Sequence, residues 1–152
     1  MATTIKKIIV TIVVLSTMLT SCAQGKNSGE KVELDKLFTA QDVGGDYHVT
    51  FSEQTDNEYT VEYRVEGSDR LALNFNVREF SSVSDAEQEY SQIADPAMQE
   101  IDGIGDRAVY YGLSFVSLVV LKDRFIFTIS GPNYSDIGPY LEYAQIVISR
   151  LP

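Results

Sequence analysis

Three runs of alternating apolar and polar residues constrain the fold of this chain more than any other feature. The runs span residues 47–52, 59–65 and 71–78. A period of two places successive side chains on opposite faces of a β-strand, so each run predicts a strand with one buried and one solvated face. Short polar turns at 54–58 and 67–69 separate the runs. We therefore expect three antiparallel strands joined as hairpins.

The alternation also assigns side chains to faces of the sheet. In the first run, Tyr47, Val49 and Phe51 are expected to face the core, and His48 falls in the polar set. In the second run, Tyr59 is expected in the core with its hydroxyl at the rim.

The second half of the chain predicts two further strands. Residues 113–121 are almost continuously apolar, which is typical of a strand that is covered on both faces or lies centrally in a sheet. After a tight turn at 122–123, a second strand spans 125–129 and ends before Gly131-Pro132.

Helical spacing of apolar residues occurs in three places. The first helix is expected within 32–42, the second begins at a predicted capping box of Ser84 and Glu87, and the third spans 136–150. The resulting fold class is α+β, with about five mostly antiparallel strands and two or three helices packed on one face. Residues 32–152 are expected to form a single domain.

The N-terminus has the three parts of an export signal. Lys6 and Lys7 precede an apolar run, Ile8–Leu15, and small residues then lead to Cys22, the only cysteine. The apolar run is shorter than the roughly 20 residues of a membrane-spanning helix. We therefore expect residues 1–21 to be removed as a signal peptide.

The tetrapeptide Leu19-Thr20-Ser21-Cys22 resembles the box read by the bacterial lipoprotein transferase and signal peptidase. The resemblance implies a diacylglycerol thioether on Cys22 and an N-acyl chain such as palmitate. The following residues, to position 31, are polar, include two glycines and show no apolar periodicity, so we expect residues 22–31 to be the lipidated cysteine and a flexible tether. Because Ala23 rather than Asp follows the cysteine, the resemblance also implies transfer to the outer membrane, facing the periplasm, in a Gram-negative cell. The alternative is a secreted chain with an incidental cysteine.

Charge excludes some partners. The formal net charge is −10, which argues against nucleic acid, because phosphate binding relies on Lys and Arg. The same charge argues against a domain that lies flat on an anionic membrane. Solubility is the simpler explanation of the acidity, and a cationic ligand or partner is the other.

Residues 103–108 match the loose pattern G-x-G-x-x-[GA] of dinucleotide-binding turns. That fingerprint follows a strand and opens a helix, whereas these glycines follow a predicted helix and open a strand. We therefore predict no cofactor, and interpret Gly103, Gly105 and Asp106 as a tight structural turn.

No set of residues predicts catalysis or metal binding. His48 is the only histidine, and nothing around it resembles a nucleophile elbow. The acidic turn Asp56-Asn57-Glu58 lacks the order of an EF-hand loop. The prediction is a protein that is not an enzyme and holds no metal.

Tyrosines suggest a binding groove near the last predicted helix. Tyrosine suits binding surfaces because its ring is apolar and its tip is polar. The candidates are Tyr110, Tyr111, Tyr134 and Tyr140. The alternative is that these rings pack at strand ends and against helix faces.

The stretch 84–151 resembles small extracytoplasmic sensor-like domains of bacterial lipoproteins and kinases. The shared features are an Ala- and Glu-rich helix, the 103–108 turn, a hairpin with a short polar turn, and an amphipathic helix ending in Arg150-Leu151. The resemblance implies a small α+β domain that binds rather than catalyses. We expect a lipid-anchored, non-catalytic interaction module with an envelope protein partner, or alternatively a small-ligand-binding or sensor-type domain.

Overall fold

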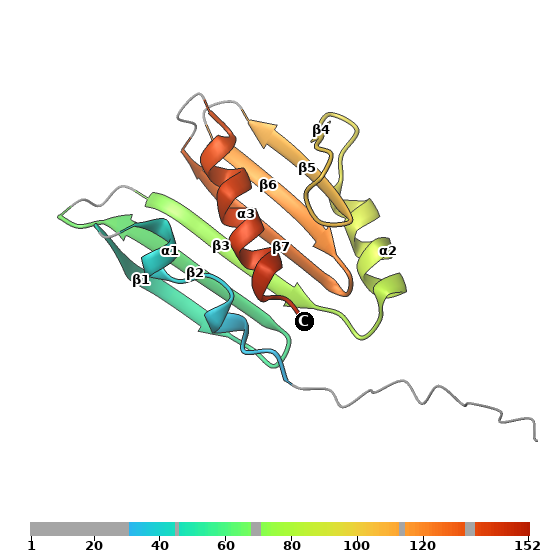
Figure 1. Ribbon diagram of the computed structural model, residues 1–152, viewed down its shortest axis with the longest axis horizontal. Helices are drawn as coiled ribbons and strands as arrows, with labels where there is room; N and C mark the ends of the chain where they lie inside the picture. Colours follow the sequence, from blue (N-terminus) through green and yellow to red (C-terminus); the bar gives the residue numbers. More distant parts are fainter. Residues whose placement is uncertain (1–30, 45, 68–70, 113–114, 133–135) are drawn as a thin grey trace, which may run out of the picture. The chain divides into compact units, whose positions relative to one another are not determined.

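The computed structural model describes residues 31–44, 46–67, 71–112, 115–132 and 136–152, without the side chains of 71 and 72. The expected signal peptide, Cys22 and most of the expected tether lie outside these residues. Residues Lys31–Pro152 form one unit. Its strands make a seven-stranded antiparallel sheet in the order β1-β2-β3-β7-β6-β5-β4 (Figure 1).

The strands are β1 (Tyr47–Gln54), β2 (Glu58–Val65), β3 (Leu71–Glu79), β4 (Gln99–Glu100), β5 (Arg107–Gly112), β6 (Phe115–Lys122) and β7 (Phe125–Pro132). The α+β class and the antiparallel pairing are confirmed, and the sheet has seven strands where about five were expected. The two unpredicted strands are β4 and β5. The first has only two residues, too few to show a period, and adjacent aromatic residues, Tyr110 and Tyr111, obscure the alternation of the second.

The helices are η1 (Leu34–Lys36), α1 (Ala40–Val43), α2 (Val83–Ile93) and α3 (Gly138–Arg150). Figure 1 shows η1, α1 and α3 in front of the sheet, where they cover the larger of two cores. Among the described residues, no helix is long and apolar enough to cross a membrane.

The second core lies on the other face of the sheet, under α2. There Ala86 and Tyr90 pack against residues of β5, β6 and β7, which are Val109, Val119, Leu121 and Ile126. The expectation that all helices pack on one face is therefore wrong. The strand β6 is apolar on both faces, so a helix is needed on each side to remove its side chains from water.

A β-bulge changes which residues of β1 face the larger core. Val49 pairs with Tyr63, but the register then shifts and Phe51 pairs with Glu62. Residues directly opposite each other in an antiparallel pair share a face. Phe51 therefore lies on the polar face, and the expectation that it faces the core is wrong. The extra residue, Thr50, reverses the alternation.

The helix starts also differ from the predicted ones. Ser82, not Ser84, caps α2: its hydroxyl accepts a hydrogen bond from the Asp85 amide at 3.1 Å. The segment expected to form one helix over 32–42 is divided into η1 and α1, because Thr39 is extended and begins a new capping box with Asp42.

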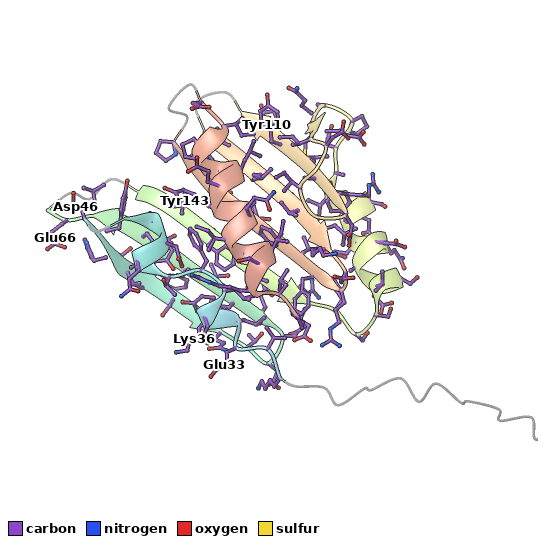
Figure 2. The ribbon with its side chains drawn as sticks, in the orientation of Figure 1. Glu33, Lys36, Asp46, Glu66, Tyr110 and Tyr143 are labelled. Atoms are coloured by element: carbon purple, nitrogen blue, oxygen red, sulfur yellow. The ribbon has the colours of Figure 1, made fainter. Side chains whose placement is uncertain are left out.

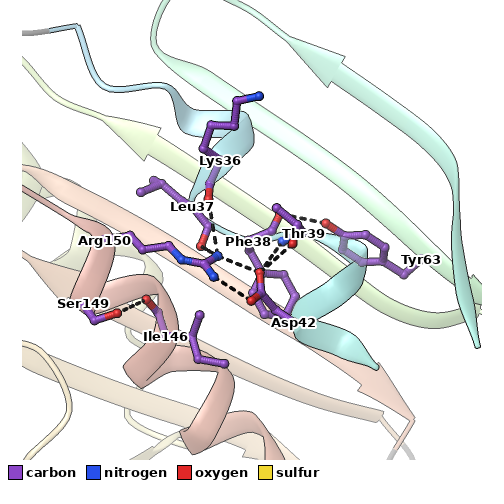
Figure 3. Close-up of polar contacts among 9 residues, drawn as sticks. All are labelled: Lys36, Leu37, Phe38, Thr39, Asp42, Tyr63, Ile146, Ser149 and Arg150. Carbon is purple, nitrogen blue, oxygen red and sulfur yellow. Dashed lines mark hydrogen bonds and ion pairs between the residues drawn. The ribbon is translucent and has the colours of Figure 1, made fainter. Parts of the chain in front are cut away.

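A partly exposed ion pair ties the last helix to the first segment (Figure 3). The Arg150 Nη1 and Nη2 atoms donate to the two carboxylate oxygens of Asp42 at 2.6 and 2.7 Å, and Nη1 also donates to the Leu37 carbonyl at 3.1 Å. The hydrogen bonds from Arg150 lower the pKa of Asp42 despite its partial burial. Beside this pair, the Tyr63 hydroxyl donates to the Phe38 carbonyl at 2.8 Å. These contacts lock η1, α1 and α3 into one layer.

Candidate interaction surface

The face of the sheet that carries α2 is only partly covered. The helix lies over β5, β6 and β7, and the second core contains no residue of β1, β2 or β3. Strand register places one row of side chains across this face, from β5 to β1. In that order the row is Tyr111, Ser117, Ser130, Asn74, Glu62 and Phe51. We call the uncovered part the open face.

Aromatic side chains stand at both sides of the open face. Phe51 on β1 is 44% exposed, and Tyr111 and Phe115 on β5 and β6 are 45% and 43% exposed. Phe115 shares the face of Ser117, which is two residues further along β6. Exposed aromatic residues at the ends of one row are typical of protein interfaces, which are enriched in Tyr and Phe.

The centre of the open face is polar and mostly uncharged. Asn76 lies on β3 and donates to the Glu58 Oε1 and Thr60 Oγ1 atoms at 2.9 and 2.7 Å. The hydroxyls of Ser117 and Ser130 lie 3.0 Å apart and share a hydrogen bond. The hydroxyl and amide groups can hydrogen-bond to a partner at a lower desolvation cost than the Glu58 and Glu62 carboxylates beside them.

The predicted 103–106 turn joins β4 to β5. Gly103 and Gly105 both have positive φ, at 80° and 60°. The Asp106 carboxylate accepts from the Asp123 amide at 2.6 Å and from Lys122 Nζ at 3.0 Å. These two contacts, the amide first, lower the pKa of Asp106. Asp106 therefore ties the 103–106 turn to the turn of the β6–β7 hairpin.

The four tyrosines proposed for a groove do not share one surface. Tyr110 is half-buried on the α3 side and donates to Gln99, whereas the next residue, Tyr111, is on the open face. Tyr140 is buried and donates to the Pro132 carbonyl, and Tyr134 lies outside the described residues. Figure 2 shows Tyr110 on β5, away from Tyr143 on α3. Adjacent residues of a strand point to opposite faces of the sheet, and for this reason Tyr110 and Tyr111 lie on different surfaces.

The other candidate positions lie on the surface. His48 is exposed on the edge strand β1, and its Nδ1 atom lies 3.3 Å from a carboxylate oxygen of Glu66. Figure 2 labels Glu66, which follows the last residue of β2. Asp56 in the acidic turn is fully exposed and pairs loosely with Lys31 at 3.8 Å. Across the residues that the structure describes, no group of three or more His, Cys, Asp and Glu side chains is placed to hold a metal.

Comparison with protein-family models, curated proteins and solved structures found no match to this chain. Function is therefore inferred from the geometry of the chain itself. Two features of the open face escaped the sequence analysis. Phe51 is exposed because of a β-bulge, and no pattern of residues predicts that bulge. Phe115 is exposed because α2 packs on other residues of β6 and does not cover it.

Proposed function

We propose that this protein is a lipid-anchored component of the bacterial cell envelope that acts as a non-catalytic interaction module. The anchor is supported by Leu19-Thr20-Ser21-Cys22, which follows a basic start and an apolar run. Diacylglycerol and N-acyl chains on one residue, at about 0.8 kcal/mol per buried methylene, hold a protein stably on a membrane. In a Gram-negative cell, the domain then faces the periplasm from the outer membrane.

Replacement of the single thiol tests the anchor. In cells fed radiolabelled palmitate, the wild-type protein should carry the label and sediment with membranes. The Cys22→Ser variant should lose the label and leave the membrane fraction, and Ser28→Ala, a control in the tether, should behave as wild type. A labelled or membrane-bound Cys22→Ser protein would contradict the proposal.

The partner-binding surface we propose is the open face. The observation that carries this assignment is the row that joins exposed Tyr111 to exposed Phe51 across a polar centre, in which Glu62 is the charged member. Aromatic anchors around a polar patch can bury a large area at low entropic cost. We expect the partner to be another envelope protein, because the domain's net negative charge disfavours nucleic acid and anionic lipid.

Site-specific photo-crosslinking in cells tests this surface. A photoreactive amino acid at position 111 or 115 should capture a single stoichiometric protein, identified by mass spectrometry. The matched control carries the photoreactive amino acid at position 142, which is exposed on α3 on the other side of the sheet. Equal capture from position 142, or no capture from the open face, would overturn the assignment.

A specific observation favours small-ligand binding as a second candidate function. A hollow of about 120 Å³ lies between Tyr90 of α2 and the segment 100–108. Pockets for drug-sized ligands enclose roughly 300–1,000 Å³, so this hollow would hold only a smaller molecule.

A further inference from the structure

The two edges of the sheet differ in how they are protected from pairing with another chain (Figure 1). Natural sheets protect an edge with a very short strand, with lysine or with proline. The edge strand β4 has two residues, whereas β1 has eight and contains neither lysine nor proline. Every residue of β1 from His48 to Gln54 is exposed, and no strand of the described residues pairs with its outer side. The β1 edge therefore offers backbone groups to a further strand.

Hydrogen bonds at the two ends of the β1–β2 ladder show which residues of β1 direct backbone groups outward. At one end, the Glu66 amide donates to the Asp46 carbonyl at 2.8 Å. At the other end, the Thr55 amide donates to the Glu58 carbonyl at 2.8 Å. Every second residue of an antiparallel strand makes such bonds, and the residues between them direct their groups to the opposite side. Counted from each end to the bulge, the outward residues are Tyr47, Val49, Ser52 and Gln54.

The bulge also makes the order of faces along β1 symmetric about its centre. The side chains on the side of the larger core are Tyr47, Val49, Ser52 and Gln54, and those on the other side are His48, Thr50, Phe51 and Glu53. Thr50 belongs to the second set because its Oγ1 accepts from Nε of Arg64, the register partner of His48, at 3.3 Å. A regularly alternating strand of eight residues, reversed end to end against itself, would set opposite faces together. With the bulge, the two halves of β1 mirror each other.

We propose that β1 pairs antiparallel with β1 of a second copy of this chain, about a two-fold axis that is perpendicular to the sheet and passes between residues 50 and 51. The pairs are Tyr47–Gln54, His48–Glu53, Val49–Ser52 and Thr50–Phe51, and the symmetry forms each of them twice. In this register, both members of every pair share a face, and outward backbone groups meet outward backbone groups. A shift by one residue in either direction loses both matches.

The side chains of β1 are compatible with this register. The His48 ring lies opposite the Glu53 carboxylate of the second copy, and no two like charges oppose each other. Phe51, which is 44% exposed, lies opposite Thr50 of the second copy, and the two Phe51 rings meet beside the axis. A second copy is favoured over an unrelated extended peptide because β1 matches its own reverse along its full length, whereas a peptide requires no such symmetry.

The pairing joins two seven-stranded sheets into one and brings the open faces of the two copies together on one side. This inference does not depend on the proposed envelope partner. Positions 111 and 115, which test that partner, lie on β5 and β6, away from β1. The two proposals can therefore fail independently.

Disulfide crosslinking in cells tests the register. Two differently tagged full-length chains are produced together, one with His48→Cys and the other with Glu53→Cys. Their thiols lie across a non-hydrogen-bonded pair, where the side chains are close enough for a disulfide. We expect a disulfide-linked heterodimer after mild oxidation. The matched control combines His48→Cys with Ser52→Cys, which is one residue away on the other face, and should give no such product.

The linked peptides are identified by mass spectrometry. A disulfide through Cys22 would count against the proposed lipid anchor and is not evidence for strand pairing. A heterodimer linked through positions 48 and 53 supports the inference whether or not Cys22 carries lipid.

Charge variants test the same pairing without a covalent link. His48→Glu sets like charges opposite each other twice, so it should raise the dimer Kd roughly 3- to 30-fold, measured by sedimentation of the full chain in a nonionic detergent. Adding Glu53→Lys restores opposite charges and should restore the dimer. Gln88→Glu makes the same charge change at an exposed position of α2 and should leave the Kd unchanged. Circular dichroism verifies that each variant is folded.

Four results would overturn the inference. The first is a wild-type chain that sediments as a monomer and gives no disulfide between positions 48 and 53. The second is an equal yield of disulfide from the Ser52→Cys control. The third is a His48→Glu defect that Glu53→Lys does not repair. The fourth is a β1 thiol that links to a different protein in place of the second copy, since the edge would then serve a partner strand.

Discussion

At the scale of single residues, two glycines in one turn differ in how much space surrounds them. A Cβ on Gly105 would lie 2.6 Å from the Leu121 carbonyl oxygen and 2.7 Å from Val120 Cγ1, whereas a Cβ on Gly103 would meet nothing within 4 Å. Both have positive φ. Gly105→Ala should therefore cost about 3 kcal/mol or more in unfolding free energy, from strain and collision together. Gly103→Ala, the control, should cost about 1 kcal/mol. Urea unfolding measures both, and equal losses would contradict the packing role of Gly105.

The Asp42–Arg150 pair predicts a pH dependence. The pKa of Asp42 is lowered in the folded state from its ordinary value of 3.8. The pair therefore stabilises the fold fully above that value, and this contribution disappears as the pH falls through the folded pKa. Asp42→Asn should cost about 1–3 kcal/mol at pH 7, and the difference from wild type should shrink near pH 3. Asp46→Asn, at an exposed carboxylate, is the control; an unchanged difference at pH 3 would refute the role of the Asp42 charge.

At the scale of elements, the start of α2 depends on one hydroxyl among neighbouring serines. Ser82 accepts from the Asp85 amide, and Asp85 in turn accepts from the hydroxyls of Ser81 and Ser82 at 2.7 and 2.8 Å. Ser82→Ala should lower the unfolding free energy by about 1 kcal/mol. Ser84→Ala changes an exposed residue within the first turn and should shift it by less than about 0.5 kcal/mol. Chemical denaturation of the two variants tests the assignment. A larger loss of unfolding free energy for Ser84→Ala would show that Ser84 is the cap.

At the scale of the whole molecule, the sheet separates two cores that should contribute independently. Leu118 is buried on the α3 side of β6 and Leu121 on the α2 side. Each Leu→Ala change should cost about 2–5 kcal/mol, and the double variant should be close to the sum, because the two side chains share no partner across the sheet. Phe115→Ala, at an exposed residue of the same strand, should cost under about 1 kcal/mol. A double variant far from additive would show that the cores act as one.

The sequence by itself determined the local structure wherever one face of an element meets the core. The hairpins of β1, β2 and β3, the doubly apolar β6 and the amphipathic α3 follow from the period of their residues, because burial of one face selects that period. The same local reasoning led to the wrong cap for α2. Ser82 and Ser84 each have an acidic residue three positions later, and only the backbone conformation, extended at Ser82, shows which serine is the cap.

Only the tertiary structure decided which surfaces stay open. The bulge at Thr50 moves the Phe51 side chain to the face of the sheet away from the larger core. The position of α2 leaves Tyr111 and Phe115 exposed. The hollow beside α2 likewise brings together Tyr90 from a helix and Arg107 from a strand. The physical reason is that periodicity reports which residues avoid water, whereas the choice of face, the register shift and the convergence of distant side chains depend on packing between elements.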